Sequence, residues 1–304
     1  MAGQQVHNID DPKHFVLYRY HPSLVAAAIF TVLFGLTTFF HVYQTIRLRS
    51  WFMIAFIIGG FFETVGYIGR ILSSNDQWNL NPFIMQTLLL LLAPALFAAS
   101  VYMILGRIIL LTNGEPYALI RSSWLTKIFV TGDVLSFLMQ GAGGGMMSSA
   151  KKDPSKIKLG ERVIIIGLFA QIFFFGFFVV VAVSFQIRAR QHLATLNSTL
   201  LPWKKFLNVL YVTSALILIR SVFRMIEYLQ GNTGFLLRHE VFLYLFDALL
   251  MLAVMVVVNV VHPGAIAGLL KGKADRERFV ELAESNVESK EAKSSTTVGS
   301  RSLA

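Results

Sequence analysis

Long runs of hydrophobic residues, separated by short polar segments, dominate this sequence. An α-helix needs about 20 such residues to cross the hydrocarbon core of a bilayer. The pattern therefore predicts an all-α integral membrane protein, a bundle of seven transmembrane helices. The predicted spans are 22–44, 51–72, 81–111, 123–147, 161–188, 202–230 and 238–262.

The positions of the prolines support these boundaries. Pro22, Pro82 and Pro202 stand at the beginnings of hydrophobic runs, where a helix does not need the N–H group that proline lacks. Pro94 is different, because it lies inside the third span. Proline removes one helical hydrogen bond and clashes with the preceding turn, so we expect Pro94 to kink this helix and to act as a hinge.

Composition agrees with a membrane protein. Hydrophobic residues make up 55% of the chain and charged residues only 14%, whereas a soluble domain carries about 25% charged residues. The net charge of +10 is concentrated at the ends of the hydrophobic runs, which indicates membrane orientation rather than binding to nucleic acid. The chain contains no cysteine, which excludes disulfides and thiol catalysis.

The chain divides into one membrane domain and two polar ends. Residues 1–20 are polar and lack the hydrophobic core of a cleavable signal peptide, so we expect an extracellular N-terminal segment. The seven-helix domain occupies residues 21–264. Residues 265–304 form the C-terminal end, which is polar and rich in Ser and Thr from residue 271 on, so we expect a cytosolic tail that is mostly disordered.

The orientation follows from Lys and Arg, which are enriched in cytoplasmic segments of membrane proteins. More of them face the cytosol if the N-terminus is outside and the C-terminus is inside. The basic loop Lys151–Arg162 falls on the other side, and no feature of the sequence explains it. The sequon Asn197-Ser198-Thr199 would face the cytosol and remain unmodified.

One stretch in the second span, Phe61–Arg70, combines charge with hydrophobic surroundings. Its residues Glu63, Tyr67 and Arg70 are spaced i, i+4 and i+7, which places them on one face of a helix. An ionised side chain inside a bilayer costs about 3 kcal/mol or more, so it is expected to face protein or water and to have a partner.

Later spans supply suitable partners. The sixth span carries Arg220, Arg224 and Glu227, and the seventh carries Glu240, Tyr244 and Asp247. We expect Glu63 and Asp247 at the deep end of an outward-facing cavity. The full set of predicted substrate-binding and translocation residues is Glu63, Tyr67, Arg70, Gln86, Asp133, Gln140, Arg220, Arg224, Glu227, Glu240, Tyr244 and Asp247. The alternative is that these residues form static ion pairs that hold the helices together.

Two further features have simpler interpretations. The segment Gly141–Gly145, at the end of the fourth span, is expected to be a flexible loop, with a close approach of the backbone to a ligand as the alternative. His41 and His262 lie near the ends of the first and seventh spans, where we expect them at the membrane interface. Neither histidine has the spacing of a metal-binding pair, so no metal site and no cofactor are expected. The absence of a phosphate-binding loop, of Gly-x-Ser-x-Gly and of His-Glu-x-x-His argues against an enzyme.

The motifs together resemble the fungal resistance-to-aminocholesterol family, also called lipid-translocating exporters. The resemblance extends from about Tyr20 to Gly264. Its segments are Glu63-Thr-Val-Gly-Tyr-Ile-Gly-Arg70, Gln86 with Ala93-Pro94-Ala-Leu-Phe-Ala-Ala-Ser-Val-Tyr102, Gly132-Asp133 through Gln140-Gly-Ala-Gly-Gly-Gly145, Arg220-Ser-Val-Phe-Arg224-Met-Ile-Glu227, and Glu240, Tyr244 and Asp247 with His262-Pro263-Gly264.

The resemblance implies a fungal seven-helix membrane protein that translocates or exports amphiphilic lipids and so confers resistance to stress or toxins. Sphingoid long-chain bases and sterol-like or other toxic amphiphiles are the implied substrates, with membrane lipids as partners. We expect the plasma membrane as its location, with the vacuole or another internal membrane as the alternative. Two other functions stay open: a seven-helix sensor of lipid stress, and an intramembrane lipid hydrolase.

Overall fold

The computed structural model describes residues 22–75, 79–149, 154–196, 201–230, 234–273, 275–276 and 278. The described residues form helices and connecting turns, with no strand among them. The long helices are α1 Leu24–Leu48, α2 Ile54–Asn75, α3 Leu80–Leu111, α4 Ser122–Ser149, α5 Pro154–Arg188 and α7 Trp203–Gln230. The last traverse is divided into α8 Phe235–Arg238, α9 Glu240–Leu243, the π-helical turn η3 Tyr244–Ala248 and α10 Leu249–Val260. Short 3₁₀ turns (η1 Trp51–Met53, η2 Glu115–Tyr117) and the helix α6 Arg190–Thr195 lie between long helices.

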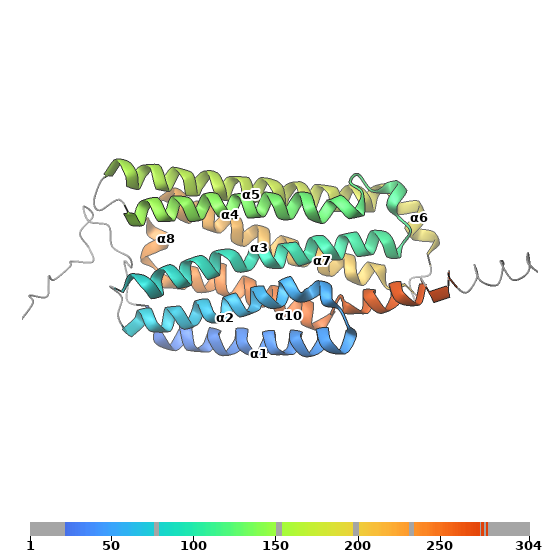
Figure 1. The fold of residues 1–304 in the computed structure, drawn as a ribbon, viewed down its shortest axis with the longest axis horizontal. Helices are drawn as coiled ribbons and strands as arrows, with labels where there is room; N and C mark the ends of the chain where they lie inside the picture. Colours follow the sequence, from blue (N-terminus) through green and yellow to red (C-terminus); the bar gives the residue numbers. More distant parts are fainter. Residues whose placement is uncertain are drawn as a thin grey trace, which may run out of the picture.

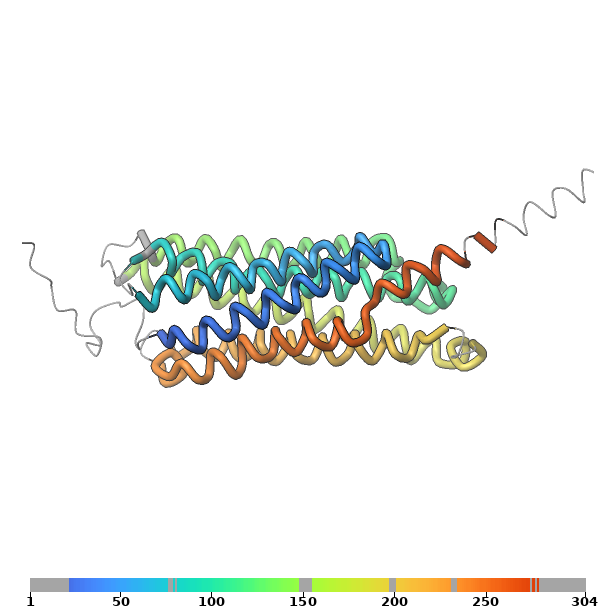
Figure 2. Tube along the Cα trace, turned by 90° about the horizontal axis from the view of Figure 1, so that it is seen from below, coloured from blue at the N-terminus to red at the C-terminus, as the bar shows by residue number. Residues whose placement is uncertain are grey.

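The long helices lie side by side in one elongated bundle (Figure 1). Neighbours in sequence pack together from α1 to α5, α5 packs on α7, α7 on α10, and α10 returns to α1. This order closes the helices into a ring. Helix α3 also packs directly on α7 across the ring, which makes α3 the most enclosed helix of the bundle. Figure 2 shows that the blue start of α1 and the red last helix lie at opposite ends of the bundle.

The hydrophobic surface of the bundle identifies it as a multi-pass membrane protein. Six described segments are long and apolar enough to cross a bilayer: Leu24–Leu48, Trp51–Asn75, Asn81–Leu111, Ser155–Arg188, Trp203–Gln230 and Glu240–Lys273. Large apolar side chains such as Phe169, Phe173 and Val180 are exposed on the outer surface, as expected for contact with lipid. Six of the seven predicted spans are thus confirmed by length and hydropathy.

Helix α4 is the predicted span that does not meet this criterion. It is 28 residues long and packs between α3 and α5, but glycines and the polar residues Asp133 and Gln140 lower its hydropathy. The count of seven spans, the N-out orientation and the domain limits therefore stay predictions. The predicted N-terminal segment, the sequon Asn197-Ser198-Thr199 and most of the predicted tail lie outside the described residues.

The prediction of a flexible loop at Gly141–Gly145 was wrong, because these glycines belong to α4. A Cβ on Gly143 would lie 2.6 Å from the carbonyl oxygen of Gly160 in α5, so the glycine lets the two backbones touch. Helix α5 begins at Pro154, seven residues before the predicted start of the fifth span. The basic residues Lys156 and Lys158 consequently lie on a helix rather than in a loop.

Candidate functional site

A buried ion pair joins α7 to the π-helical turn η3. Arg220 Nε donates to Asp247 Oδ1 at 2.5 Å, and the exposed fractions of the two side chains are 1% and 5%. Arg220 Nη2 also donates to the backbone carbonyl of Leu90 in α3, at 2.7 Å. Because Leu90 stands four residues before Pro94, its carbonyl has no helical N–H donor, and Arg220 supplies one. One guanidinium thus connects three elements.

Glu63 lies beside this pair and is itself buried, with 2% of its surface exposed. It interacts electrostatically with Asp247 and Arg220, so two carboxylates feel the charge of one guanidinium. Among the described residues, no Lys or Arg lies within ion-pair distance of Glu63, and none donates it a hydrogen bond. Both Glu63 and Asp247 are buried, and their predicted place at the deep end of an outward-facing cavity stays a prediction.

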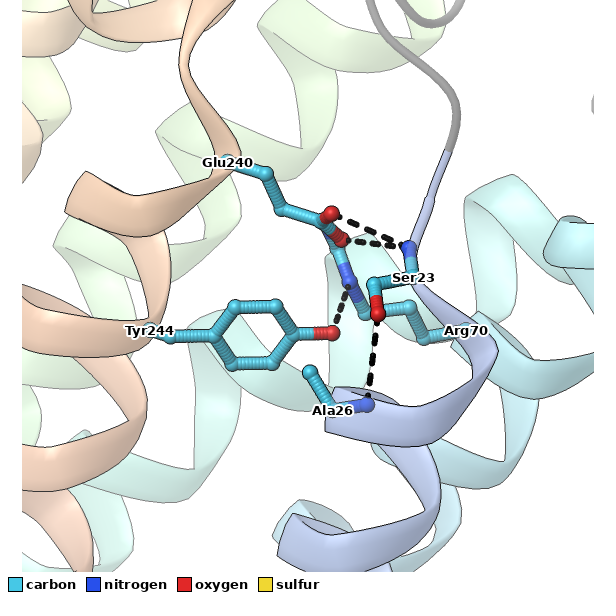
Figure 3. Close-up of polar contacts among 5 residues, drawn as sticks. All are labelled: Ser23, Ala26, Arg70, Glu240 and Tyr244. Atoms are coloured by element: carbon cyan, nitrogen blue, oxygen red, sulfur yellow. Dashed lines mark hydrogen bonds and ion pairs between the residues drawn. The ribbon is translucent and has the colours of Figure 1, made fainter.

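A second charged group lies at the end of the bundle where α1 begins (Figure 3). Arg70 Nη2 binds Glu240 Oε1 at 2.7 Å, and Arg70 Nε donates to the Tyr244 hydroxyl at 3.0 Å. Both oxygens of Glu240 accept a hydrogen bond from the Ser23 N–H, at 3.0 Å each. Ser23 caps α1 in turn, because its Oγ accepts from the Ala26 N–H at 3.3 Å. Arg70 and Glu240 therefore tie α2, α9 and the start of α1 together.

The third pair is local to α7. Arg224 Nη1 binds Glu227 Oε2 at 2.7 Å, one turn along the same helix, and Glu227 is buried. The Arg224 guanidinium also lies over the Tyr228 ring, 5.5 Å from its centroid. Glu227 interacts electrostatically with Arg220 and Asp247 as well, so this pair adjoins the central one.

A cluster of aromatic rings adjoins the Arg70–Glu240 pair through Tyr244, whose ring lies 5.2 Å from the Arg70 guanidinium. Tyr67 stacks on Phe34, with ring centroids 5.4 Å apart, and Phe30 stacks on Tyr244 at 5.3 Å. Tyr67 also stacks with Phe30 and Tyr244, so α1, α2 and the last traverse contribute to one aromatic cluster. The Tyr67 hydroxyl is buried, and no described residue forms a hydrogen bond with it.

The remaining predicted site residues, Gln86, Asp133 and Gln140, form no hydrogen bond with the three arginines in the described part of the chain. Gln86 is buried where α3 faces Gly69 of α2, and its Oε1 accepts no hydrogen bond from a described residue. Asp133 accepts a hydrogen bond from the Tyr102 hydroxyl at 2.8 Å, and Gln140 donates to Gln171 at 3.1 Å. Asp133 and Gln140 therefore link α4 to α3 and α5.

Two features of this site were missed from the sequence. The π-helical turn η3 contains Asp247, and such turns occur frequently at functional sites. The turn changes the angular position of the residues after it, which no residue spacing indicates. The contact between Arg220 and the Leu90 carbonyl was also missed, although Pro94 is the signal that such a carbonyl exists.

The family model described as RTA1 like protein matches residues 56–269, most of the chain and every charged pair above. The chain belongs to the RTA1-like family. This family assignment confirms the resemblance drawn from the motifs of α2, α3, α4, α7, α9 and η3 and from the segment that follows α10. No solved structure matches the chain.

Several relatives from Saccharomyces cerevisiae support the assignment of the chain to the RTA1-like family. It is 36% identical to "Protoporphyrin uptake protein 1" over 281 residues, which cover 81% of this chain and 91% of that protein. It is 38% identical to "Protein RTA1" over 276 residues, covering 82% and 85% of the two chains. A more distant relative is "Sphingoid long-chain base transporter RSB1", 26% identical over 276 residues, which cover 80% of this chain and 72% of that one.

Proposed function

We propose that this protein moves amphiphilic lipids with a cationic headgroup, such as sphingoid long-chain bases, across a membrane. The observation that carries the proposal is the charge balance of the buried site. Arg220 is paired with Asp247, Arg70 with Glu240 and Arg224 with Glu227. Glu63 is the carboxylate left over among these residues, so the site holds one negative charge more than its arginines neutralise.

A surplus carboxylate in the interior favours one positive charge in return. A buried ion is costly unless it is paired or neutralised, so Glu63 binds either a proton or a cationic group. An ammonium headgroup beside Glu63 would interact with Asp247 as well, because both carboxylates feel the charge of Arg220. Such a site lowers the cost of several kcal/mol of carrying a charged headgroup through hydrocarbon.

The rest of the bundle suits an amphiphile. The aromatic cluster of Phe30, Phe34, Tyr67 and Tyr244 adjoins the charged site and offers apolar contact to the part of the substrate next to its headgroup. Release of the headgroup follows when Glu63 takes up a proton or when Asp247 and Arg220 re-form their pair. The state with the headgroup bound and the state with the headgroup released are close in energy, because the negative charge of Glu63 and Asp247 is neutralised in both.

The names of two relatives support lipid transport as the function but do not identify the substrate of this protein. One is named a sphingoid long-chain base transporter, and another, from Emericella nidulans, is named "Probable lipid transporter atnI". Sterol-like and other toxic amphiphiles belong to the same proposal, as does a role in stress resistance at the plasma membrane. No bond is made or broken in this function, so the proposal is a translocator and not an enzyme.

Reconstitution tests the proposal. Purified full-length protein is placed in phosphatidylcholine vesicles with a fluorescent long-chain base, and movement between leaflets is measured by quenching from outside. We expect faster movement than in vesicles without protein. Glu63→Gln is expected to slow the movement of the amine by at least about tenfold, since one lost ionic contact to a buried charge is worth about 1.4 kcal/mol or more.

Glu115→Gln is the matched control, because Glu115 is exposed at η2, remote from the paired arginines in the fold. This variant is expected to move the base at the wild-type rate. An N-acylated analogue without the positive charge is expected to be insensitive to Glu63→Gln. Wild-type movement no faster than in protein-free vesicles would refute the translocator and favour the sensor.

A further inference from the structure

A second polar region lies at the opposite end of the bundle from Arg70 and Glu240. His41 near the end of α1 and His262 just after α10 are both buried, with ring centroids 5.9 Å apart. Both rings are thus packed among the helices, while their place relative to the membrane interface stays a prediction. The Phe56 ring of α2 packs edge-on against His41, with ring centroids 4.8 Å apart. The described residue that interacts electrostatically with His41 is His262.

The hydrogen bonds of the two histidines fix their tautomers. His41 Nε2 lies 3.1 Å from the Met255 carbonyl oxygen, which only accepts, so Nε2 carries the hydrogen and Nδ1 is a free acceptor. His262 Nδ1 accepts from the Gly264 N–H at 3.0 Å, so in the neutral ring the hydrogen is on Nε2. Neither His41 Nδ1 nor His262 Nε2 has a partner within the described part of the chain. One ring thus offers an acceptor and its neighbour offers a donor.

Three buried hydroxyl groups lie before and after His41 along the chain. Thr38 lies about one turn before His41 on α1, and Thr45 lies about one turn after it. Ser50 follows α1, and Gly264 lies against both Ser50 and His262. All three hydroxyls are buried, and no residue in the described ranges forms a hydrogen bond with their oxygens. Buried polar atoms without a protein partner are generally satisfied by bound water, so we expect water molecules along these three hydroxyls.

The row leads toward Glu63. A Cβ on Gly60 would collide with Thr38 Oγ1, so α1 and α2 touch at this point. Glu63 is three residues after Gly60, one turn further along α2. The chain of polar groups therefore runs from Ser50 and His262 through His41 and Thr38 to the turn that carries Glu63.

We propose that this row, the His41–His262 seam, is a proton pathway between Glu63 and the end of the bundle. Its role in transport depends on the proposed function: a proton delivered to Glu63 displaces the cationic headgroup. A proton that enters from the end of the bundle binds His262 Nδ1, in place of the Gly264 hydrogen bond, and His262 then releases its Nε2 proton to water as water protonates His41 Nδ1. The His41 imidazolium passes its Nδ1 proton through water to the Glu63 carboxylate. One proton moves, His41 ends as it began, and His262 regains its first tautomer by exchanging its Nδ1 proton with water.

Proton flux through the full-length protein in vesicles tests the pathway. A pH-sensitive dye is enclosed, a potassium gradient with valinomycin supplies the driving force, and flux is measured with and without a long-chain base. We expect wild-type flux above that of protein-free vesicles. His41→Gln and His262→Asn are expected to reduce it by about tenfold or more, because each keeps one native hydrogen bond and removes the titratable nitrogen.

Three further proteins complete the design. His192→Gln is the matched control, because His192 lies on α6 and contacts the Thr112 carbonyl at 2.7 Å, away from the seam. It is expected to conduct like the wild type. Thr38→Val preserves shape and removes one hydroxyl of the row, so a reduced flux is expected in a folded protein even if a histidine variant fails to fold. Gly60→Ala is expected to reduce flux by moving Thr38.

The outcomes separate the two proposals. Wild-type flux equal to that of protein-free vesicles, with and without base, overturns the pathway, as does unchanged flux in folded Thr38→Val and histidine variants. Lipid movement that persists in either case leaves the translocator intact. Proton flux without any movement of the labelled base would refute the translocator while supporting the pathway.

Discussion

Arg220 donates a hydrogen bond to the backbone carbonyl of Leu90 at 2.7 Å, and this carbonyl lost its helical donor to Pro94. The same guanidinium binds Asp247. A proline that would weaken an isolated helix therefore creates an acceptor for a buried cation. The unpaired carbonyl of α3 and the carboxylate of η3 share the positive charge of α7, which is why Arg220 tolerates almost complete burial.

The first prediction concerns this arginine. Arg220→Gln should lower the free energy of unfolding by about 3–5 kcal/mol, because it leaves the Asp247 carboxylate buried without a partner. Thermal unfolding in detergent measures the change. Arg220→Gln combined with Asp247→Asn should recover part of the loss. Arg188→Gln, at an exposed position, should change stability by less than about 0.5 kcal/mol. Equal effects of both arginine variants would contradict the ion-pair interpretation.

The second prediction tests the link to Pro94. Pro94→Ala restores an N–H four residues after Leu90, so the carbonyl no longer depends on Arg220. We expect the cost of Arg220→Gln to be smaller in the Pro94→Ala background than in the wild type, by about 0.5–3 kcal/mol. A double-mutant cycle on unfolding free energies measures this coupling. Strict additivity would show that the contact with Leu90 contributes nothing.

The third prediction compares two adjacent glycines of α4. Gly143→Ala places a Cβ 2.6 Å from the Gly160 carbonyl oxygen and should destabilise the α4–α5 contact by about 1–3 kcal/mol. Gly144→Ala meets no atom within 4 Å and should stabilise the helix by up to about 1 kcal/mol. Opposite shifts in melting temperature would confirm that the glycines serve helix packing. Destabilisation by both would indicate instead that this segment needs flexibility.

The fourth prediction concerns the end of the bundle shown in Figure 3. Glu240→Ala removes the partner of Arg70 and the acceptor for the Ser23 N–H, whereas Glu240→Gln keeps one neutral acceptor. Glu240→Ala should therefore be the less stable variant, by about 1 kcal/mol or more. Limited proteolysis near the start of α1, compared with thermal unfolding, measures the difference. Glu240→Gln as unstable as Glu240→Ala would assign the whole effect to charge.

Much of the bundle could be predicted from the sequence, because hydrophobic length and proline position act locally. The charged residues and tyrosines that share one helical face in α2, α7 and the last traverse were predictable for the same reason. Residues three, four and seven apart lie on the same face of a helix. Which arginine binds which carboxylate was not predictable. The choice depends on the order of helices around the ring and on the packing of α3 against α7, and neither leaves a periodic signal.

Local departures from regular helix and loop patterns were the second reason why parts of the structure could not be predicted from the sequence. Glycines favour turns in water, so Gly141–Gly145 indicated a loop, yet close packing against α5 stabilises a helix there. The π-helical turn at Asp247 has no residue signature at all. His41 and His262 were predicted near the interface because they are polar residues at span ends, but their burial among the helices was not predicted. Their burial follows from the Met255 carbonyl of α10 and the Gly264 N–H, which satisfy one nitrogen of each ring.

The hydrogen bond between Ser23 and Glu240 has a consequence for biosynthesis. The two residues are 217 positions apart, so the first helix leaves the ribosome long before the carboxylate that holds its first turn is made. Until the last traverse enters the membrane, α1 has α2 as its neighbour but lacks α10, and one edge of the bundle stays open. Ring closure is therefore the last step of assembly. Chains that terminate before Glu240 should expose that edge to the cell's quality-control machinery.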